Sequence, residues 1–418
     1  MTGRIDVDDR NNETREPAIH SMSTTPELPT ETDVVVIGGG VIGTSIAYFL
    51  TTEADREVTL LEKDAIGAGS TGDSSAIIRR HYGEKERYTR LADWSYRFYS
   101  RFEEEVGEPI AFERNRRVTF AAEGTETADY AENGREILER LDRPVSRYEG
   151  AAMEREFPMF DLEEFDFAVS DDDAAYSDGT DVASGFARAV QDAGGTVVTG
   201  VAVEGFDVED GAIAAVETTD GPVECETAVL AAGPWTPRLA AELDVDVPIT
   251  PSRERVILLD PSEEYLERHP DVLPTAGLPG GYYARSEFGG GALIATHHSG
   301  ETCDPDDYRN TPDQETLLEL HATLSEYVPG LEDAGVQGRY SGVYSNTPDH
   351  DFILDECGPA GCYLACGFSG HGFKHAPAIG RLMTDLIEDG RSELTDLEFF
   401  SLSRFADDDG GHGGGIEF

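Results

Sequence analysis

Three glycines and one glutamate near the start of the chain are spaced as a ligand-binding turn requires. Gly38, Gly40 and Gly43 form a G-x-G-x-x-G pattern, and Glu62 follows the last glycine by 19 positions. Glycine at these positions permits a tight turn, a close backbone approach to a phosphate, and close packing of a helix on a strand. A glutamate there accepts both hydroxyls of an adenosine ribose and repels a 2′-phosphate. The pattern predicts a site for FAD or NAD rather than NADP.

The surrounding residues have the apolar periodicity of a strand, a helix and a second strand. The apolar run 34–37 precedes the first glycine, a helix is expected from Val41 to about Leu50, and the run 58–61 leads into Glu62. This order places a pyrophosphate at a helix N-terminus, where free N–H groups and the helix dipole favour anions. The alternative is a glycine-rich turn in some other α/β protein.

The composition limits the classes of partner. The chain has 418 residues, enough for two domains, and 32 Lys plus Arg against 84 Asp plus Glu, a formal charge of −52. Such a charge repels phosphate backbones, so we expect no nucleic-acid partner. Because the acids are spread along the whole chain, we hypothesise a halophilic protein adapted to high salt.

The cysteines and the hydropathy indicate a cytoplasmic protein. The five cysteines form no C-x-x-C pair, so free thiols are expected rather than a metal site or a disulfide framework. No apolar run approaches the roughly 18 residues of a transmembrane helix, and the N-terminus has no apolar signal core.

The order of the expected elements predicts an α/β chain, α+β overall, in which a Rossmann-like nucleotide-binding domain carries an inserted antiparallel-sheet domain. A helix over 312–327 is expected to have Thr311 as its N-cap, with Gln314 completing a capping box. The predicted division is a disordered acidic tail at 1–30, a nucleotide-binding domain from 31–110, 170–250 and 336–405, a substrate-binding domain from 111–169 and 251–335, and a disordered tail at 406–418.

Three further motifs accompany the glycine pattern, and their order and spacing resemble a known family. They are Ile77-Ile78-Arg79 with Tyr82-Gly83-Glu84, Ala231-Ala232-Gly233-Pro234-Trp235, and Gly367-Phe368-Ser369-Gly370-His371-Gly372-Phe373-Lys374. Together they resemble the FAD-dependent amine and amino-acid oxidoreductases of the D-amino-acid oxidase superfamily, most closely the branch of sarcosine oxidase and the sarcosine oxidase β subunit. The resemblance covers about residues 33 to 400 and implies FAD as the cofactor.

The resemblance also implies the site residues. Arg79 and Lys374 are expected to bind the carboxylate of the substrate, since a guanidinium fork and an ammonium both suit that group. Tyr283 and His298 are expected to line the substrate pocket. His297 is the alternative to His298, because only one of two neighbouring side chains on a strand can face the flavin. Besides the glycine pattern and Glu62, the expected FAD contacts are Ser70, Thr71, Val203, Gly233, Trp235, Gly370, His371, Gly372, Phe373 and Lys374.

Two positions depart from monomeric sarcosine oxidase. Gly342 aligns with the cysteine that binds the flavin covalently there, so we expect non-covalent FAD. Ile294 aligns with a lysine that activates oxygen, which leaves both oxidase and dehydrogenase activity open. No Asp or Glu beside the motifs is an obvious base, so we expect the amine to be neutral in a dry pocket.

These expectations combine into FAD-dependent oxidation of the C–N bond of a small amino or N-methylamino acid of the sarcosine, glycine or D-amino-acid type. A hydride passes to flavin N5, and O₂ or another acceptor reoxidises the cofactor. Two alternatives remain: a 2-hydroxy-acid dehydrogenase on the same fold, and an FAD-binding subunit of a hetero-oligomeric sarcosine-oxidase-like complex that needs partner subunits.

Overall fold

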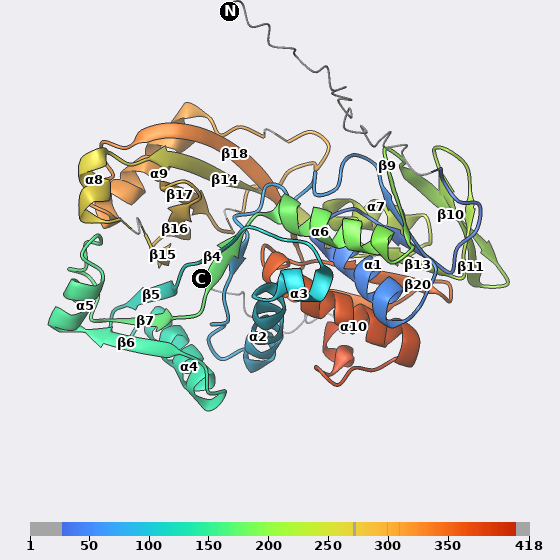
Figure 1. Cartoon of the computed structure of the whole chain (residues 1–418), viewed down its shortest axis with the longest axis horizontal. Helices are drawn as coiled ribbons and strands as arrows, with labels where there is room; N and C mark the ends of the chain where they lie inside the picture. Colours follow the sequence, from blue (N-terminus) through green and yellow to red (C-terminus); the bar gives the residue numbers. More distant parts are fainter. Residues whose placement is uncertain (1–26, 271–272, 299, 309, 407–418) are drawn as a thin grey trace, which may run out of the picture.

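A computed structural model describes residues 27–270, 273–298, 300–308 and 310–406. The two predicted tails fall almost wholly outside these described residues. Figure 1 shows the elements in two halves that lie side by side along the long axis of the molecule. Each half is built on one large sheet, and the chain passes between the halves several times.

The first half contains a six-stranded sheet that is parallel except for the pair β19–β20. Its central strand, β1, is buried along its whole length and pairs with β2 on one side and β13 on the other. Continuous apolar runs of this kind are typical of parallel strands covered on both faces. In sheet order the strands are β19 (Ile353–Glu356), β20 (Cys362–Cys366), β13 (Thr227–Leu230), β1 (Val34–Ile37), β2 (Val58–Glu62) and β9 (Thr196–Thr199).

Helix α1 (Val41–Glu53) is the centre of the helical layer on this sheet. It is buried from Val41 to Thr51 and packs between α6 and α10. A Cβ at Gly380 of α10 would lie 2.4 Å from Ser45 Oγ, so glycine is what lets these two helices approach closely. The other helices of this half are α2 (Glu86–Tyr99), α3 (Phe102–Val106), α6 (Gly179–Asp192), α7 (Thr236–Ala241) and α10 (Ala376–Asp389), with 3₁₀ turns at Gly233–Trp235 and Phe373–His375.

The second half is built on an eight-stranded sheet that is antiparallel except for the parallel pair β15–β5. Most of its strands come from the segments 111–169 and 251–335, which were predicted to form an antiparallel sheet. In order, its strands are β18 (Gly335–Asn346), β14 (Thr250–Asp260), β17 (Gly291–Thr296), β16 (Tyr282–Glu287), β15 (Thr275–Leu278), β5 (Arg117–Ala121), β7 (Phe167–Asp171) and β6 (Val145–Glu149).

Strand β18 bears on the proposed domain division. It pairs with β14 along its length, from Thr250↔Asn346 to Asp260↔Gly335. Its residues therefore belong structurally with the antiparallel sheet, although the proposed nucleotide-binding segment begins at 336. The division into domains stays a proposal, and the pairing favours a boundary after Asn346.

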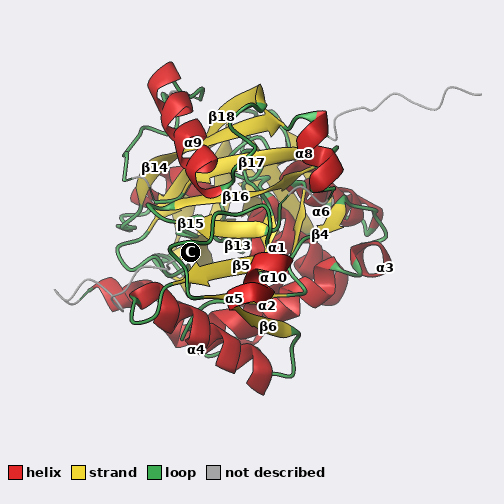
Figure 2. Ribbon diagram, turned by 90° about the vertical axis from the view of Figure 1, so that its left-hand side faces the viewer, coloured by secondary structure: helices red, strands yellow, loops and turns green. Residues whose placement is uncertain are grey.

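Helix α9 (Gln314–Tyr327) crosses one face of this sheet, as Figure 2 shows, and buries Leu320 and Leu324 against it. Its predicted cap was wrong. The N-cap is Asp313, whose carboxylate accepts a hydrogen bond from Thr316 N at 3.0 Å, because the helix begins two residues later than predicted. The other helices of this half are α4 (Glu126–Arg140), α5 (Gly150–Glu156) and α8 (Glu263–Arg268).

Two three-stranded sheets complete the fold. In the first, β10 (Val203–Glu209) and β11 (Ala212–Thr218) form a hairpin that turns at Gly211, and β12 (Val223–Glu224) joins them. In the second, β3 (Ile77–Ile78) pairs with β8 (Ala175–Ser177), which also pairs with β4 (Phe112–Arg114). The second sheet places Arg79 directly after β3.

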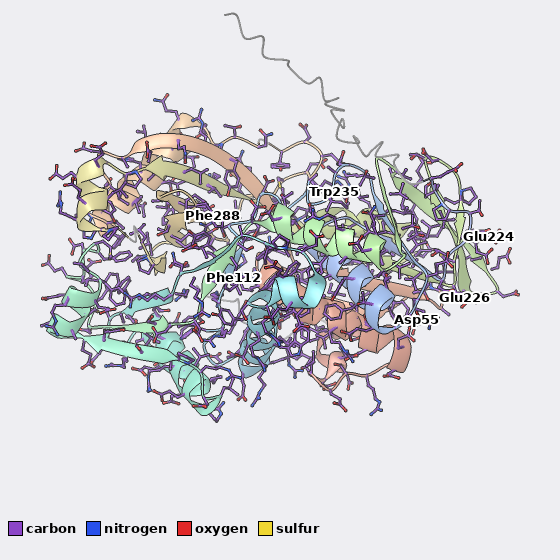
Figure 3. The ribbon with its side chains drawn as sticks, viewed as in Figure 1. Asp55, Phe112, Glu224, Glu226, Trp235 and Phe288 are labelled. Atoms are coloured by element: carbon purple, nitrogen blue, oxygen red, sulfur yellow. The ribbon has the colours of Figure 1, made fainter. Side chains whose placement is uncertain are left out.

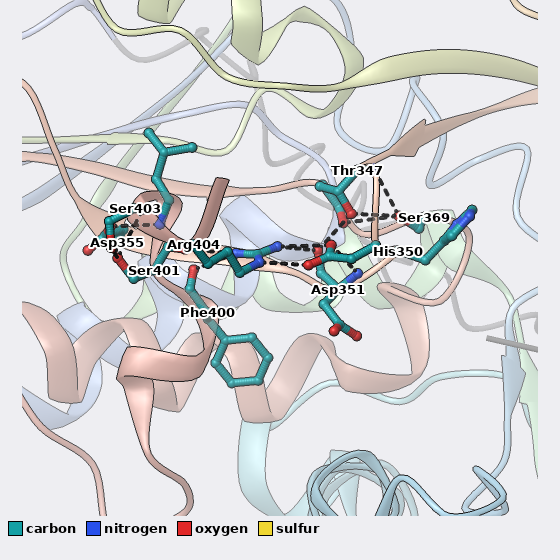
Figure 4. A network of polar contacts seen from close by, with 12 residues as sticks. Thr347, His350, Asp351, Asp355, Ser369, Phe400, Ser401, Ser403 and Arg404 are labelled. Carbon is teal, nitrogen blue, oxygen red and sulfur yellow. Dashed lines mark hydrogen bonds and ion pairs between the residues drawn. The ribbon is translucent and has the colours of Figure 1, made fainter. Parts of the chain in front are cut away.

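The end of the described chain is tied to the loop at 347–351 (Figure 4). Two 3₁₀ turns, Leu397–Phe400 and Leu402–Phe405, bring Arg404 to this loop. Arg404 forms an ion pair with buried Asp349 at 2.9 Å and donates to Asp351 O at 3.0 Å. Thr347 N in turn donates to Ser369 Oγ at 3.3 Å, so the network reaches the glycine-rich segment before Lys374.

Acidic side chains lie on the outside of the nucleotide-binding half. In Figure 3, Asp55, Glu224 and Glu226 point outward at its rim. Among the described residues no helix is both long enough and apolar enough to cross a membrane.

Candidate functional site

A cavity of about 430 Å³ opens between the two large sheets. Every predicted FAD contact lines it except Gly43 and His371, and of the four predicted substrate residues Tyr283 and Lys374 line it. One end is bounded by the glycine turn, Glu62 and Trp235, and the same cavity reaches Tyr283, Tyr344 and Lys374. The structure therefore brings motifs from four distant parts of the chain to one site.

The glycine turn is built as its sequence predicts. A Cβ at Gly43 would lie 2.0 Å from Gly38 O, so this glycine serves the packing of helix on strand and does not face the cavity. Gly40 lines the cavity and precedes α1 as an N-cap without a side-chain hydrogen bond. The N-terminus of α1 is thus presented to the cavity with its dipole directed at an incoming anion.

The carboxylate of Glu62 lies at the end of β2, where the fingerprint requires it. Its Oε2 accepts from Gly39 N at 2.6 Å and its Oε1 from Asp64 N at 2.8 Å, which fixes the side chain beside the turn. Each carboxylate oxygen has two lone pairs, so both still accept ribose hydroxyls. Thr71 Oγ1 accepts from Val41 N at 3.0 Å and holds the small-residue loop over the same turn. These residues fit the pyrophosphate and ribose of a dinucleotide.

Lys374 is a buried cation in a group of cations. It follows Gly372 in the 3₁₀ turn Phe373–His375, and its side chain is 4% exposed. Burial, reinforced by the charges of Arg79 and Arg117, lowers the pKa of Lys374 well below its usual range. A bound anion would relieve this repulsion, so the cluster is suited to a carboxylate.

Arg79 lies behind the cavity wall. It is fully buried, its guanidinium lies 4.1 Å from the centre of the Tyr82 ring, and it donates to Tyr130 Oη at 3.2 Å. Its charge acts on Lys374 and on His297, which places it beside the substrate end of the cavity.

Arg117 is a third cation that the sequence-based prediction missed. It is buried on β5, donates to the Thr119 hydroxyl, and has a second nitrogen, Nη2, for which the described residues supply no hydrogen-bond partner. Burial is the main cause that lowers its pKa to about 10. The sequence did contain a sign of this residue. Arg117 begins the apolar run Arg117-Val118-Thr119-Phe120, and an arginine is rarely buried in such a strand unless it is paired or functional.

The two neighbouring histidines do not follow strand alternation, because β17 ends at Thr296. His297 Nδ1 lies 3.2 Å from Tyr344 Oη, and its pKa is lowered by burial and by nearby cations that include Lys374. His298 has a φ of +52° and its ring packs 4.4 Å from His350. His297 is therefore the histidine directed toward the cations, whereas His298 packs away from them.

Tyr283 and His371 have different surroundings. Tyr283 lines the cavity and its hydroxyl donates to Ser75 Oγ at 3.0 Å. The His371 ring is buried against aromatic side chains and its Nε2 lies 3.0 Å from His350 O. The ring of His371 is thus part of the core rather than of the cavity wall.

Besides Glu62 and Asp64, two further carboxylates line the cavity, those of Asp73 and Glu254, although no Asp or Glu beside the motifs was expected as an obvious base. Asp73 accepts from Tyr308 Oη at 3.1 Å, and burial raises the pKa of Asp73. Glu254 is 3% exposed and accepts from Thr296 Oγ1 at 2.8 Å. Glu254 and Val256 are two positions apart on β14, so strand alternation places both side chains on the sheet face that lines the cavity.

Comparison with known proteins identifies the family. The FAD dependent oxidoreductase family matches residues 33–386. The chain belongs to this family. It is 28% identical to "Monomeric sarcosine oxidase" of Bacillus sp. (strain B-0618), covering 90% of this chain and 97% of that protein, and 29% identical to "Peroxisomal sarcosine oxidase" of Homo sapiens, covering 89% and 96%. The crystal structure of L-proline dehydrogenase from P. horikoshii superposes with a TM-score of 0.82 at 26% identity, covering 91% of this chain and 99% of that one.

The protein is thus an FAD-dependent oxidoreductase, and the cavity accounts for its cofactor. Two departures noted in the sequence differ in their surroundings. Gly342 lines the cavity, opposite Glu254 in the β14–β18 pair. Ile294 is buried in the apolar core with Leu320 and Leu324, whereas its neighbours Leu293 and Ala295 face Tyr283. The position that aligns with the oxygen-activating lysine therefore lies on the sheet face that points away from the cavity.

A segment of the antiparallel half reaches the FAD-binding half at the edge of the cavity. Asp306 accepts from Trp235 Nε1 at 2.6 Å, lies 3.6 Å from Lys63 Nζ and pairs with Arg238. Lys63 Nζ also lies 3.8 Å from the centre of the Trp235 ring. These three partners of Asp306 line the cavity, and Trp235 lies at the junction of the halves in Figure 3.

Asp306→Asn is expected to speed the release of FAD by about two- to fivefold. The effect is small because exposed ion pairs contribute little. The measurement is the rate at which flavin fluorescence appears on dilution, with Asp307→Asn as the neighbouring control. An unchanged release rate in Asp306→Asn would show that the segment does not retain the cofactor.

Proposed function

We propose that this enzyme oxidises the C–N bond of a small amino or N-methylamino acid, with FAD held non-covalently. The observation that carries the proposal is a buried cationic group: Lys374 lines the FAD cavity, and Arg79 and Arg117 lie behind it, near enough for their charges to lower its pKa. In a chain of formal charge −52, three clustered buried cations favour an anionic ligand. The carboxylate of an amino acid is the anion that fits a site beside a flavin.

Each residue has a distinct role in the proposed reaction. Lys374 binds the substrate carboxylate, with Arg79 supporting its charge from behind. Tyr283 forms the cavity wall beside it, and His297, of the two histidines, lies behind Tyr344 of the same wall. Phe373 and Lys374 of the 3₁₀ turn Phe373–His375 line the cavity and α10 follows this turn directly, so we expect the positive end of the helix dipole to favour negative charge that develops there.

The overall reaction balances with FAD as the two-electron acceptor. FAD supplies the electron sink for the hydride equivalent that leaves the carbon next to nitrogen. The chain's residues hold the substrate so that this carbon faces the cofactor and exclude bulk water while the bond breaks. The imine product then takes up water and separates into a carbonyl compound and an amine or ammonia.

The names of the relatives support the substrate class, since sarcosine and proline both carry an amine beside a carboxylate. Gly342, which offers no thiol, supports non-covalent FAD. We further propose a reducing cytoplasmic location, supported by five free cysteines. Either O₂ or another acceptor reoxidises the cofactor, and partner subunits remain an alternative route for its electrons.

Arg79→Ala is expected to raise KM for the amino acid about 10-fold, because it removes one charge that supports carboxylate binding. FAD should be retained, since Arg79 does not line the cavity. The measurement is steady-state kinetics alongside the flavin absorbance per protein. Unchanged kinetics would remove Arg79 from the site, and loss of FAD would assign it a structural role instead.

A further inference from the structure

The hairpin of β19 and β20 brings two cysteines opposite each other at the edge of the parallel sheet. The two strands are antiparallel, and their register ends with Glu356↔Tyr363. Cys357 N donates to Cys362 O at 2.9 Å, so the pairing continues by one more position, which is occupied by Cys357 and Cys362. Because opposite residues of a hairpin point to the same face, the two thiols lie side by side.

The arrangement of this pair suits a disulfide. Opposite residues of a hydrogen-bonded antiparallel pair have Cα atoms about 5.5 Å apart, within the roughly 4.4–6.8 Å that a disulfide spans. The two thiols share a hydrogen bond, which raises the pKa of Cys357 and lowers that of Cys362. One sulfur of the pair is thus favoured as a thiolate beside the other, and the thiolate is the reactive form of cysteine.

The loop at 358–361 is held from outside the hairpin. Ala360 N donates to Gly211 O, and Ala360 O accepts from Ile213 N, both at 2.9 Å. Gly361 has a φ of +81°, and a Cβ there would lie 2.2 Å from Glu226 O, so the backbone of the loop packs closely on the neighbouring segment. The two cysteines are therefore held opposite each other before any bond forms between them.

The third cysteine of this region is placed too far along the sheet to compete. Cys366 is four positions from Cys362 on β20, and its partner Ile353 is four positions from Cys357. Four positions along a strand span about 13 Å, which no disulfide bridges. Cys357 is partly exposed and Cys362 is 1% exposed, so a small oxidant reaches the pair from the side of Cys357.

We propose that Cys357 and Cys362 are a modification site at which hydrogen peroxide converts two thiols reversibly into a disulfide. One thiolate attacks the peroxide, the O–O bond breaks, and the sulfur becomes a sulfenic acid as hydroxide leaves. The second thiolate displaces hydroxide from that sulfur, so two thiols and one peroxide yield one disulfide and two waters. Neither cysteine lines the FAD cavity, so the inference is independent of the proposed substrate.

The test treats the holoenzyme in high salt with hydrogen peroxide in the presence of dimedone, which labels sulfenic acids. Catalase then removes the peroxide, and the protein is denatured, alkylated at its remaining thiols and digested with chymotrypsin. Residues 355–363 form one peptide with both cysteines, whereas Cys366 falls in the peptide 365–368. The first peptide should become lighter by two hydrogens and carry neither label, and dithiothreitol before alkylation should restore two alkyl groups.

Three controls separate this pair from general thiol oxidation. Cys303, which is also partly exposed, should take up dimedone where it reacts and form no disulfide. Cys362→Ser removes the second thiol, so dimedone on Cys357 should rise at least about 10-fold over the wild type. Cys366→Ser should form the disulfide to within about twofold of the wild-type extent, because Cys366 lies too far along the strand to take part.

The outcomes that overturn the inference are equally specific. One is a wild-type peptide 355–363 that stays fully alkylated under conditions that oxidise Cys303. Another is dimedone on wild-type Cys357 at the level found in Cys362→Ser. A disulfide that joins Cys357 to Cys366 would also overturn it, and none of these results bears on the proposed oxidation of an amino acid.

Discussion

Lys374→Met is expected to lower kcat/KM for the amino acid by about 10- to 150-fold, the range of one charged hydrogen bond. Methionine is close to lysine in length and shape, so the change removes charge and leaves the cavity filled. The flavin should remain bound, because the glycine turn and Glu62 hold the other end of the cofactor. The measurement is flavin reduction by substrate in a rapid-mixing experiment, which separates binding from the reaction step.

The same variant should be more stable than the wild type in the absence of substrate. Burial and the charges of Arg79 and Arg117 oppose the charged form of Lys374, and methionine removes that repulsion. Lys85→Met is the matched control, since Lys85 pairs with Asp351 at 3.6 Å and does not line the cavity. A kinetic loss in Lys85→Met equal to that in Lys374→Met would mean that the effect is not specific to the site.

The fold is expected to lose stability as the pH falls from 6.5 toward 4. Burial lowers the pKa of His81 and of His298 to about 4, whereas both have a pKa near 6.5 when the chain is unfolded. The neutral folded form is therefore fully favoured above pH 6.5. Below it, the unfolded chain takes up protons that the folded chain does not bind, so stability falls.

The size of the loss follows from linkage. At pH 5.5 each of these two histidines costs about 1.4 kcal/mol relative to alkaline pH. His297, His371 and His375 have pKa values shifted in the same direction by burial, so they add to the loss. The measurement is the melting temperature at fixed high salt, compared at pH 8.5, 7.5 and 5.5. It should change little over the first step and fall by several degrees over the second; equal values at pH 7.5 and 5.5 would contradict the assignment of these histidines as buried and neutral.

The FAD-binding end of the site was predictable from the sequence because its signals are local. Gly38 to Glu62 form one continuous strand, turn, helix and strand, so spacing alone fixes which groups meet. A Cβ at Gly43 would lie 2.0 Å from Gly38 O, which agrees with the predicted packing role, and Gly40 lines the cavity. The membership of the FAD dependent oxidoreductase family and the mixed α/β fold are confirmed as well.

The substrate end was harder to predict because its residues meet through long-range pairing. Glu254 faces the cavity because β14 pairs with β18 in a register that sets Gly342 opposite it, nearly 90 positions away in sequence. His297 and His298 lie just beyond the end of β17, where alternation no longer decides direction. The alignment of Ile294 with a lysine likewise could not reveal which way the side chain points, and the sheet directs Ile294 into the core.

The most direct test of the account is an anaerobic titration of the purified, FAD-loaded protein in high salt. Sarcosine, glycine, D-alanine, proline and 2-hydroxyglutarate are added in turn while the flavin absorbance is followed, and air is admitted afterwards. The account predicts bleaching by at least one amino acid and none by the hydroxy acid, and the speed of recolouring in air then separates oxidase from dehydrogenase. Bleaching by 2-hydroxyglutarate alone, or by none of the five, would contradict it.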